Sequence, residues 1–103
     1  MVKFVALWRK PEDPAAFDAW YLGPHMAICR EYPDAESIKV ARVTGTPRGE
    51  SEFHMMFEAV YPDRDTMMAS LTSEPGMRSA MDARGSGFGS LMNGFFVEDV
   101  DAG

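Results

Sequence analysis

Cysteine and long apolar runs are scarce in this sequence of 103 residues. The single cysteine, Cys29, excludes an internal disulfide and any metal site built from several cysteines, and it fits a reducing compartment. No apolar run approaches the roughly 20 residues that a membrane-spanning helix needs. Residues 1–13 have a short apolar run followed at once by charge and a Pro-Glu-Asp turn, so no secretory signal is visible. We therefore expect a cytoplasmic protein.

Basic runs are also missing, and the formal net charge is −6. Because nucleic acids and anionic membranes are bound by clusters of Lys and Arg, we expect neither partner. The two histidines lie far apart among scattered carboxylates, which is no recognised metal-ligand spacing. The nine methionines are equally dispersed, which indicates packing rather than ligation. The sequence thus predicts neither a metal nor another cofactor.

The hydrophobic pattern alternates between strand-like and helix-like segments over one domain, residues 1–103. Strands are predicted where β-branched and aromatic residues dominate, at residues 2–9, 36–45, 52–61 and 91–100. Helices capped by Asp13, Asp63 and Ser73 are predicted at residues 14–32, 64–73 and 74–84. Residues 85–90, rich in Gly and Ser, are expected to form a flexible loop. The order β-α-β-β-α-β predicts an α+β, ferredoxin-like fold with a four-stranded antiparallel sheet and helices on one face.

One face of this predicted sheet has no cover. The first strand carries Phe4 and Trp8 on one face and Val5 and Leu7 on the other, and the later strands are similarly apolar. Helices cover only one face, and exposed apolar surface costs about 25 cal/mol per Å². We therefore predict a homodimer that packs sheet against sheet.

The first predicted helix is interrupted by Gly23-Pro24, directly before His25. Pro24 has no N–H to donate to the carbonyl of Trp20, so the helix should bend or split there. If Pro24 starts a new helical segment, His25 lies in the first turn, where the positive end of the dipole favours a neutral imidazole. Such a ring suits a general base. The alternative interpretation is a structural histidine that packs against Trp20 and Tyr21.

Two further polar side chains are candidates for the same site. His54 is either a second proton-transfer group or a histidine of the dimer interface, and regular alternation places it on the strand face of Glu52 and Glu58. Arg42 interrupts an apolar strand face, so it either pairs with Glu52 or Glu58 or faces a ligand anion.

Aromatic residues on the predicted strands and first helix could line a pocket for a small hydrophobic ligand, and a plain core is the alternative interpretation. The candidates for this lining are Trp8, Trp20, Tyr21, Phe57 and Tyr61. Cys29 is expected to be a small buried apolar residue.

Three segments resemble the EthD family of small dimeric α/β-barrel proteins: residues 7–28, 38–49 and 52–76. The most specific match is Phe-Asp-Ala-Trp-Tyr-Leu-Gly-Pro-His, which ends at His25. The resemblance implies a ferredoxin-like dimer, and the family is commonly labelled oxidoreductase-associated without a demonstrated cofactor. Related dimeric barrels include isomerases, cofactor-free monooxygenases and haem-degrading enzymes, but nothing beyond His25 in this chain supports haem ligation.

Three hypotheses about function follow. The first is a cofactor-independent enzyme, an oxidoreductase or isomerase, acting on an apolar carbonyl, aromatic or lactone compound. In it His25 moves the proton, Tyr21 hydrogen-bonds beside it, and Arg42 or His54 stabilises the developing oxyanion. The second is a non-catalytic ligand-binding or accessory protein of an oxidoreductase system. The third is a dimerisation module without a pocket.

Overall fold

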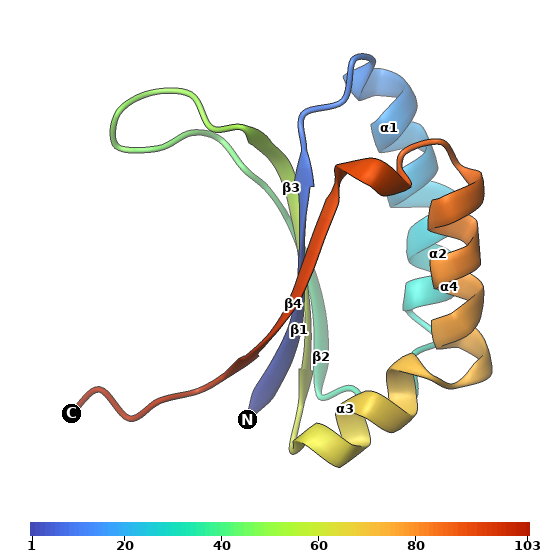
Figure 1. Cartoon of the computed structure of the whole chain (residues 1–103), viewed down its shortest axis with the longest axis vertical. Helices are drawn as coiled ribbons and strands as arrows, with labels where there is room; N and C mark the ends of the chain where they lie inside the picture. The colour runs from blue at the N-terminus through green and yellow to red at the C-terminus, as the bar shows by residue number, and fades with distance from the viewer.

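A computed structural model describes residues 1–103 and contains a four-stranded antiparallel sheet with every helix on one side of it (Figure 1). The order across the sheet is β2-β3-β1-β4. The strands are β1 (Val2–Arg9), β2 (Ser37–Arg42), β3 (Phe53–Tyr61) and β4 (Met92–Glu98). The predicted ferredoxin-like fold is confirmed, although β2 and β4 are shorter than expected: residues 36, 43–45 and 99–100 lie outside the strands, and Leu91 belongs to a 3-10 turn.

The helical segments are α1 (Pro14–Trp20), η1 (Tyr21–His25), α2 (Met26–Cys29), α3 (Arg64–Leu71), α4 (Glu74–Gly85) and η2 (Gly89–Leu91). Three of the helical segments, α1, α3 and α4, begin at the predicted caps. Asp13, Asp63 and Ser73 each accept a hydrogen bond from the backbone N–H three residues later. Gly76 is needed where α4 follows α3, because a Cβ there would collide with the carbonyl oxygen of Leu71. None of these helices is long and apolar enough to cross a membrane.

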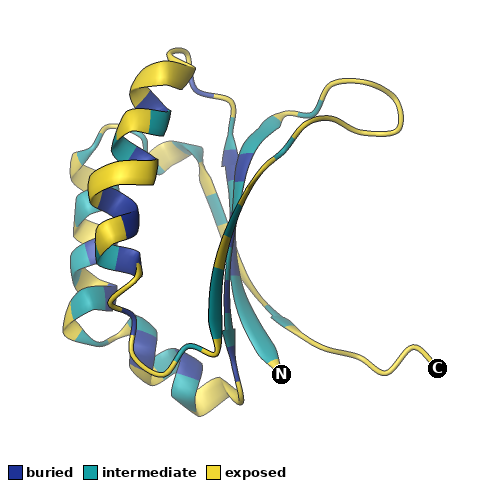
Figure 2. Ribbon diagram, turned by 180° about the vertical axis from the view of Figure 1, so that it is seen from behind, coloured by how far each residue is buried: buried dark blue, intermediate teal, exposed yellow.

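The core lies between the helices and the inner face of the sheet, as the burial colouring shows (Figure 2). Trp8 of β1 lies opposite Met55 of β3, and Ala6 lies opposite Phe57, so both central strands direct the same kind of side chain inward. Phe88, in the segment expected to be flexible, packs against Phe17 at a ring-centroid distance of 5.3 Å. This contact attaches the α4–β4 connection to α1.

The outer face of the sheet is covered by no element of the chain. Phe95 is 42% exposed and lies opposite Val5 of the central strand β1. Leu7 and Met56 lie opposite each other on the same face. The loop of residues 43–52 and the residues after Glu98 extend from the sheet on this side, away from the helices (Figures 1 and 2).

Candidate active site

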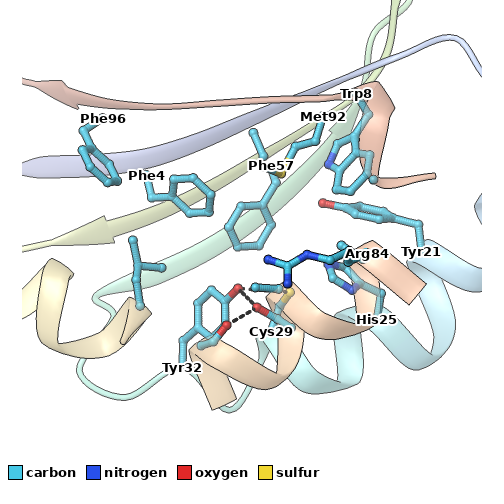
Figure 3. Close-up of a pocket in the computed structure, with 17 residues that line it drawn as sticks. Phe4, Trp8, Tyr21, His25, Cys29, Tyr32, Phe57, Arg84, Met92 and Phe96 are labelled. Carbon is cyan, nitrogen blue, oxygen red and sulfur yellow. Dashed lines mark hydrogen bonds between the residues drawn. The ribbon is translucent and has the colours of Figure 1, made fainter. Parts of the chain in front are cut away.

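A cavity of about 380 Å³ lies between the inner face of the sheet and the helices η1, α2 and α4 (Figure 3). Its volume is at the lower end of the range for small-molecule sites. Most of the 17 lining residues are hydrophobic, and they are Phe4, Ala6, Trp8, Tyr21, His25, Cys29, Tyr32, Phe57, Leu71, Gly76, Ser79, Ala80, Ala83, Arg84, Gly89, Met92 and Phe96.

The space exists because α4 presents small side chains to the sheet. Gly76, Ser79, Ala80 and Ala83 recur at a spacing of three or four residues and all line the cavity. The opposite wall consists of large rings, among them Phe57. The space between α4 and the sheet therefore stays open because the side chains of α4 are too short to fill it.

The backbone that carries His25 passes through Pro24 in a widened helical turn. The N–H of Met26 bonds to the carbonyl of Tyr21, five residues earlier, and this accommodates a proline without ending the helix. The expectation that Pro24 starts a new helix is therefore wrong, because a π-type turn absorbs the missing donor. The widened turn keeps Phe17, Tyr21, His25 and Cys29 on the buried side of the helix at a regular spacing of four.

His25 forms a close pair with Asp82 of α4. Its Nδ1 lies 2.9 Å from Oδ2 of Asp82, and the same oxygen accepts a 3.0 Å hydrogen bond from the indole N–H of Trp20. Because a carboxylate can only accept, Nδ1 donates and the lone pair of the imidazole is left on Nε2. The ring packs against those of Trp20 and Tyr21, with centroid distances of 4.6 and 5.2 Å, and these two rings also contact each other.

Burial sets the protonation state of His25. The residue is 5% exposed, and desolvation lowers its pKa below the ordinary 6.5, although the hydrogen bond and charge of Asp82 act in the opposite direction. The imidazole is thus neutral near pH 7, as the sequence predicted. The cause differs from the predicted one, since the ring does not lie at a helix N-terminus.

Two hydrogen-bond donors lie beside His25 in the cavity wall. Nε1 of Trp8 is buried and has no hydrogen-bond partner, which is rare for a buried polar atom. Burial raises the pKa of Tyr21 well above its ordinary value, so its hydroxyl remains protonated. The nitrogen end of Trp8 and the hydroxyl of Tyr21 are both directed toward the space between Phe57 and Arg84 (Figure 3).

A second polar group of side chains borders the cavity at Tyr32. Its hydroxyl is hydrogen-bonded to Ser79, and the Ser79 hydroxyl also donates to the carbonyl of Gly76 (Figure 3). Cys29 lies beside them, and burial raises the pKa of its thiol to about 11. Cys29 is therefore a protonated, buried thiol, in accord with the packing role expected from the sequence.

The structure brings together some of the predicted site residues. His25, Tyr21, Trp8 and Phe57 all line the cavity. Trp20 lies behind His25 and contacts Asp82 instead of the cavity. Tyr61 is buried and hydrogen-bonded to Ser70, 2.9 Å away, and does not line the cavity.

His54 and Arg42 lie at a different place, next to Asp18 of α1. Nε2 of His54 is 2.8 Å from one carboxylate oxygen of Asp18, and a guanidinium nitrogen of Arg42 is 3.0 Å from the other. Glu52 and Glu58, expected as partners of Arg42, do not pair with it. Regular alternation would place His54 on the outer face of the sheet. The pairing of β1 with β3 is irregular at this point: Trp8 lies opposite Met55 and the next residue, Arg9, lies opposite Phe53. His54 therefore has no partner on β1, and its side chain is free to leave the regular alternation.

The sequence interpretation missed two residues of the site, Asp82 and Arg84. Both belong to α4, whose small inward residues Gly76, Ser79 and Ala83 were a recognisable signal of a space against that helix. The pairing of Asp82 with His25 had no local signal, because the two residues are 57 positions apart. Arg84 projects into the cavity and is described below.

The fold and this cavity define a ferredoxin-like α+β protein in which a buried histidine, paired with a half-buried aspartate, lies beside an apolar space. No protein-family model matches the chain, and no curated protein matches it significantly. An ethyl tert-butyl ether D (EthD) family protein from Bacillus halodurans C-125 is 35% identical, with a TM-score of 0.91 over 97% of this chain and 99% of that one. This chain belongs to the EthD family, as its sequence segments predicted.

Two more distant solved structures share the fold. A dimeric ferredoxin-like protein of unknown function from Jannaschia sp. CCS1 is 14% identical, with a TM-score of 0.72 over 96% of this chain and 100% of that one. A mutant of SnoaB, a cofactor-independent oxygenase from Streptomyces nogalater, is 16% identical, with a TM-score of 0.63 over 99% of this chain and 93% of that one.

Proposed function

We propose that the protein is a cofactor-independent enzyme that removes a proton next to the carbonyl group of an apolar compound. The observation that carries this proposal is the His25–Asp82 pair, which has a lone pair on Nε2 at the wall of an apolar cavity. A general base needs to be neutral near pH 7, and the lowered pKa of His25 meets that need. A merely structural histidine would be surrounded by side chains alone.

In the proposed reaction, Nε2 of His25 takes the proton as the C–H bond breaks, and the bonding electrons move onto the carbonyl oxygen to give an enolate. Asp82 stabilises the imidazolium that forms. The N–H of Trp8 and the O–H of Tyr21 donate to the enolate oxygen, the role that the sequence had assigned to Arg42 or His54. Return of the proton from His25 to another carbon completes an isomerisation. With O₂ as a second substrate, the enolate would instead be oxygenated.

The family and the fold neighbours support the proposal without choosing between these outcomes. SnoaB has the same fold and is described as a cofactor-independent oxygenase. An assignment as isomerase or oxidoreductase therefore depends on the substrate, whereas the first proton transfer is common to both.

The test is hydrogen–deuterium exchange of two carbonyl probes in D₂O, followed by proton NMR. The probes are 1-tetralone, an aromatic ketone, and a β,γ-unsaturated butenolide, a lactone. We expect the protein to accelerate exchange next to the carbonyl, and His25→Gln to reduce the rate by about a hundredfold, because general-base catalysis contributes about 10²–10⁴.

The matched control is His54→Gln, which removes the other histidine and leaves the cavity intact. Its exchange rate should stay within about twofold of the parent rate. Exchange that His25→Gln leaves unchanged would contradict the proposal. Binding of the probes without exchange would favour the alternative of a non-catalytic ligand-binding or accessory protein.

We also propose that the protein is a homodimer joined through the outer face of the sheet. That face carries Val5, Leu7 and Phe95, and the loop and C-terminal residues extend on the same side, where they would flank a second copy (Figure 1). The neighbour from Jannaschia is described as dimeric. Burying this apolar face would remove it from water at a gain of about 25 cal/mol per Å².

Sedimentation velocity tests the dimer. The parent should sediment as a dimer at micromolar concentration, and Phe95→Glu should shift it to monomer, because a buried unpaired carboxylate opposes association. Met77→Glu, on the exposed side of α4, is the control and should remain dimeric. A parent protein that sediments as a monomer would contradict the proposal.

A further inference from the structure

The cavity has one permanently charged side chain in its lining, Arg84 of α4. No carboxylate lines the cavity, although the chain contains 16 acidic residues against 10 Lys and Arg. Asp82, the nearest acidic residue in the sequence, is hydrogen-bonded to His25 and Trp20. Arg84 is therefore a positive charge in a cavity lining that contains no acidic side chain.

The guanidinium of Arg84 has no acidic partner in the chain. Arginine salt bridges are formed by Arg42 and Arg78, and Arg84 forms none. The last turn of a helix favours a basic residue, but that dipole effect does not require the side chain to turn toward the sheet. In the view of Figure 3 the guanidinium extends across the cavity, between Phe57 and Cys29.

A second cation contacts one of the lining residues from outside the lining. The guanidinium of Arg64, from α3, lies 5.4 Å from the ring centroid of Phe96, which lines the cavity. The exposed lining residues Arg84, Met92 and Phe96 mark the mouth. The mouth is thus apolar and positively charged, whereas the polar donors of Trp8 and Tyr21 lie deeper.

We infer that the ligand of this cavity is an anion: an apolar carbonyl compound of one or two rings that carries a carboxylate, which Arg84 binds at the mouth. An arginine fork matches the two oxygens of a carboxylate, and the apolar wall accepts the ring. The inference deepens the proposed function and rests on it for the carbonyl group, because the carbonyl oxygen would reach Trp8 and Tyr21 next to His25.

The test compares the binding of two matched probes, 2-naphthoate and its neutral amide 2-naphthamide, by calorimetric titration. We expect the parent to bind naphthoate about tenfold more tightly than naphthamide at low salt, and this preference should shrink as salt screens the exposed Arg84. Arg84→Met should abolish the preference by weakening naphthoate alone, and Arg84→Lys should retain part of it.

A control variant makes the result specific. Arg48→Met removes the same charge from an exposed loop outside the cavity and should leave the preference unchanged. The titration measures binding alone and no exchange, so a failure of the proposed catalysis remains separate from a failure of anion selection. Equal affinities for the two probes, no binding of either, or a preference that survives Arg84→Met would overturn the inference.

Discussion

The protein contains two histidine–aspartate pairs of nearly equal length and different surroundings. His25 and Asp82 are 2.9 Å apart, and His54 and Asp18 are 2.8 Å apart. In the first pair, His25 packs against the rings of Trp20 and Tyr21 and lines the cavity, and Asp82 is otherwise bonded only to the indole of Trp20. Asp18 in the second pair also binds Arg42, and that pair does not reach the cavity.

The difference shows that a histidine–aspartate contact does not by itself define a catalytic pair. His25 uses Nδ1 for its aspartate and keeps Nε2 at a space where a substrate fits, whereas His54 uses Nε2 for an aspartate that is shared with a cation. We therefore propose that the first pair carries the chemistry and that the second connects β3 to α1. The following predictions separate these assignments, from the largest expected effect to the smallest.

Replacing the aspartates should affect activity very differently. Asp82→Asn should slow the exchange reaction by about tenfold or more, because an amide can donate to Nδ1 and so place the proton on Nε2, the wrong tautomer for a base. Asp18→Asn should change the rate by less than about twofold. NMR measurements of the exchange rate compare the two variants. Equal losses of rate in both would contradict the assignment of different roles to the two pairs.

The activity should decrease in acid through His25. Because burial lowers the pKa of His25 below 6.5, the rate should stay constant from neutral pH down to that lowered pKa and then fall about tenfold per pH unit. The pH–rate profile of the parent checks this, and His54→Gln should give the same profile. An inflection above pH 6.5 would contradict the neutral-base assignment.

Stability should be lost in two separate pH ranges. Below pH 6.5 the unfolded chain binds a proton at His25 before the folded chain does, so the free energy of unfolding decreases as the pH falls toward the lowered pKa. Burial opposes ionisation of Asp18, but the hydrogen bonds of His54 and Arg42 outweigh it and lower its pKa below 3.8. The stability that ionised Asp18 adds to the folded protein is present above pH 3.8 and is lost as the pH falls through the lowered pKa of Asp18.

Thermal unfolding across pH measures both ranges. His25→Gln should remove the loss that begins below pH 6.5, and Asp18→Asn should remove the loss in strong acid. At neutral pH Asp18→Asn should also lower the stability by about 1 kcal/mol, a few degrees in Tm, since one partner of a hydrogen-bonded group is lost. If the pH dependence of Tm is the same in the parent and in both variants, neither His25 nor Asp18 causes the loss of stability in acid.

The smallest expected effect concerns the residue that holds Asp82. Trp20→Phe keeps an aromatic ring against His25 and removes the 3.0 Å hydrogen bond to Asp82. The exchange rate should fall about threefold while the pH profile moves, because Asp82 is then less well oriented toward His25. Arg42→Met should leave both the rate and the profile unchanged. A rate loss without a moved profile would indicate a general packing effect.

Much of the fold follows directly from local sequence. The caps Asp13, Asp63 and Ser73 begin their helices as predicted, and the alternation on β1 and β3 divides each strand into two faces. These features depend on neighbours a few positions apart, so the sequence displays them. The sequence also indicated His25 as a candidate residue, because Gly23-Pro24 precedes it and the segment resembles the EthD family.

Only the tertiary structure decided which groups surround that histidine. Pro24 is absorbed by a π-type turn, and the irregular register of β3 moves His54 toward α1. Helix α4 brings Asp82 to His25 and Arg84 to the cavity. Each result depends on contacts between segments far apart in the chain, and a local pattern carries no information about them. The sequence by itself therefore determined the elements and the family, and three-dimensional packing determined which face of β3 meets the helices and which polar groups lie at the cavity.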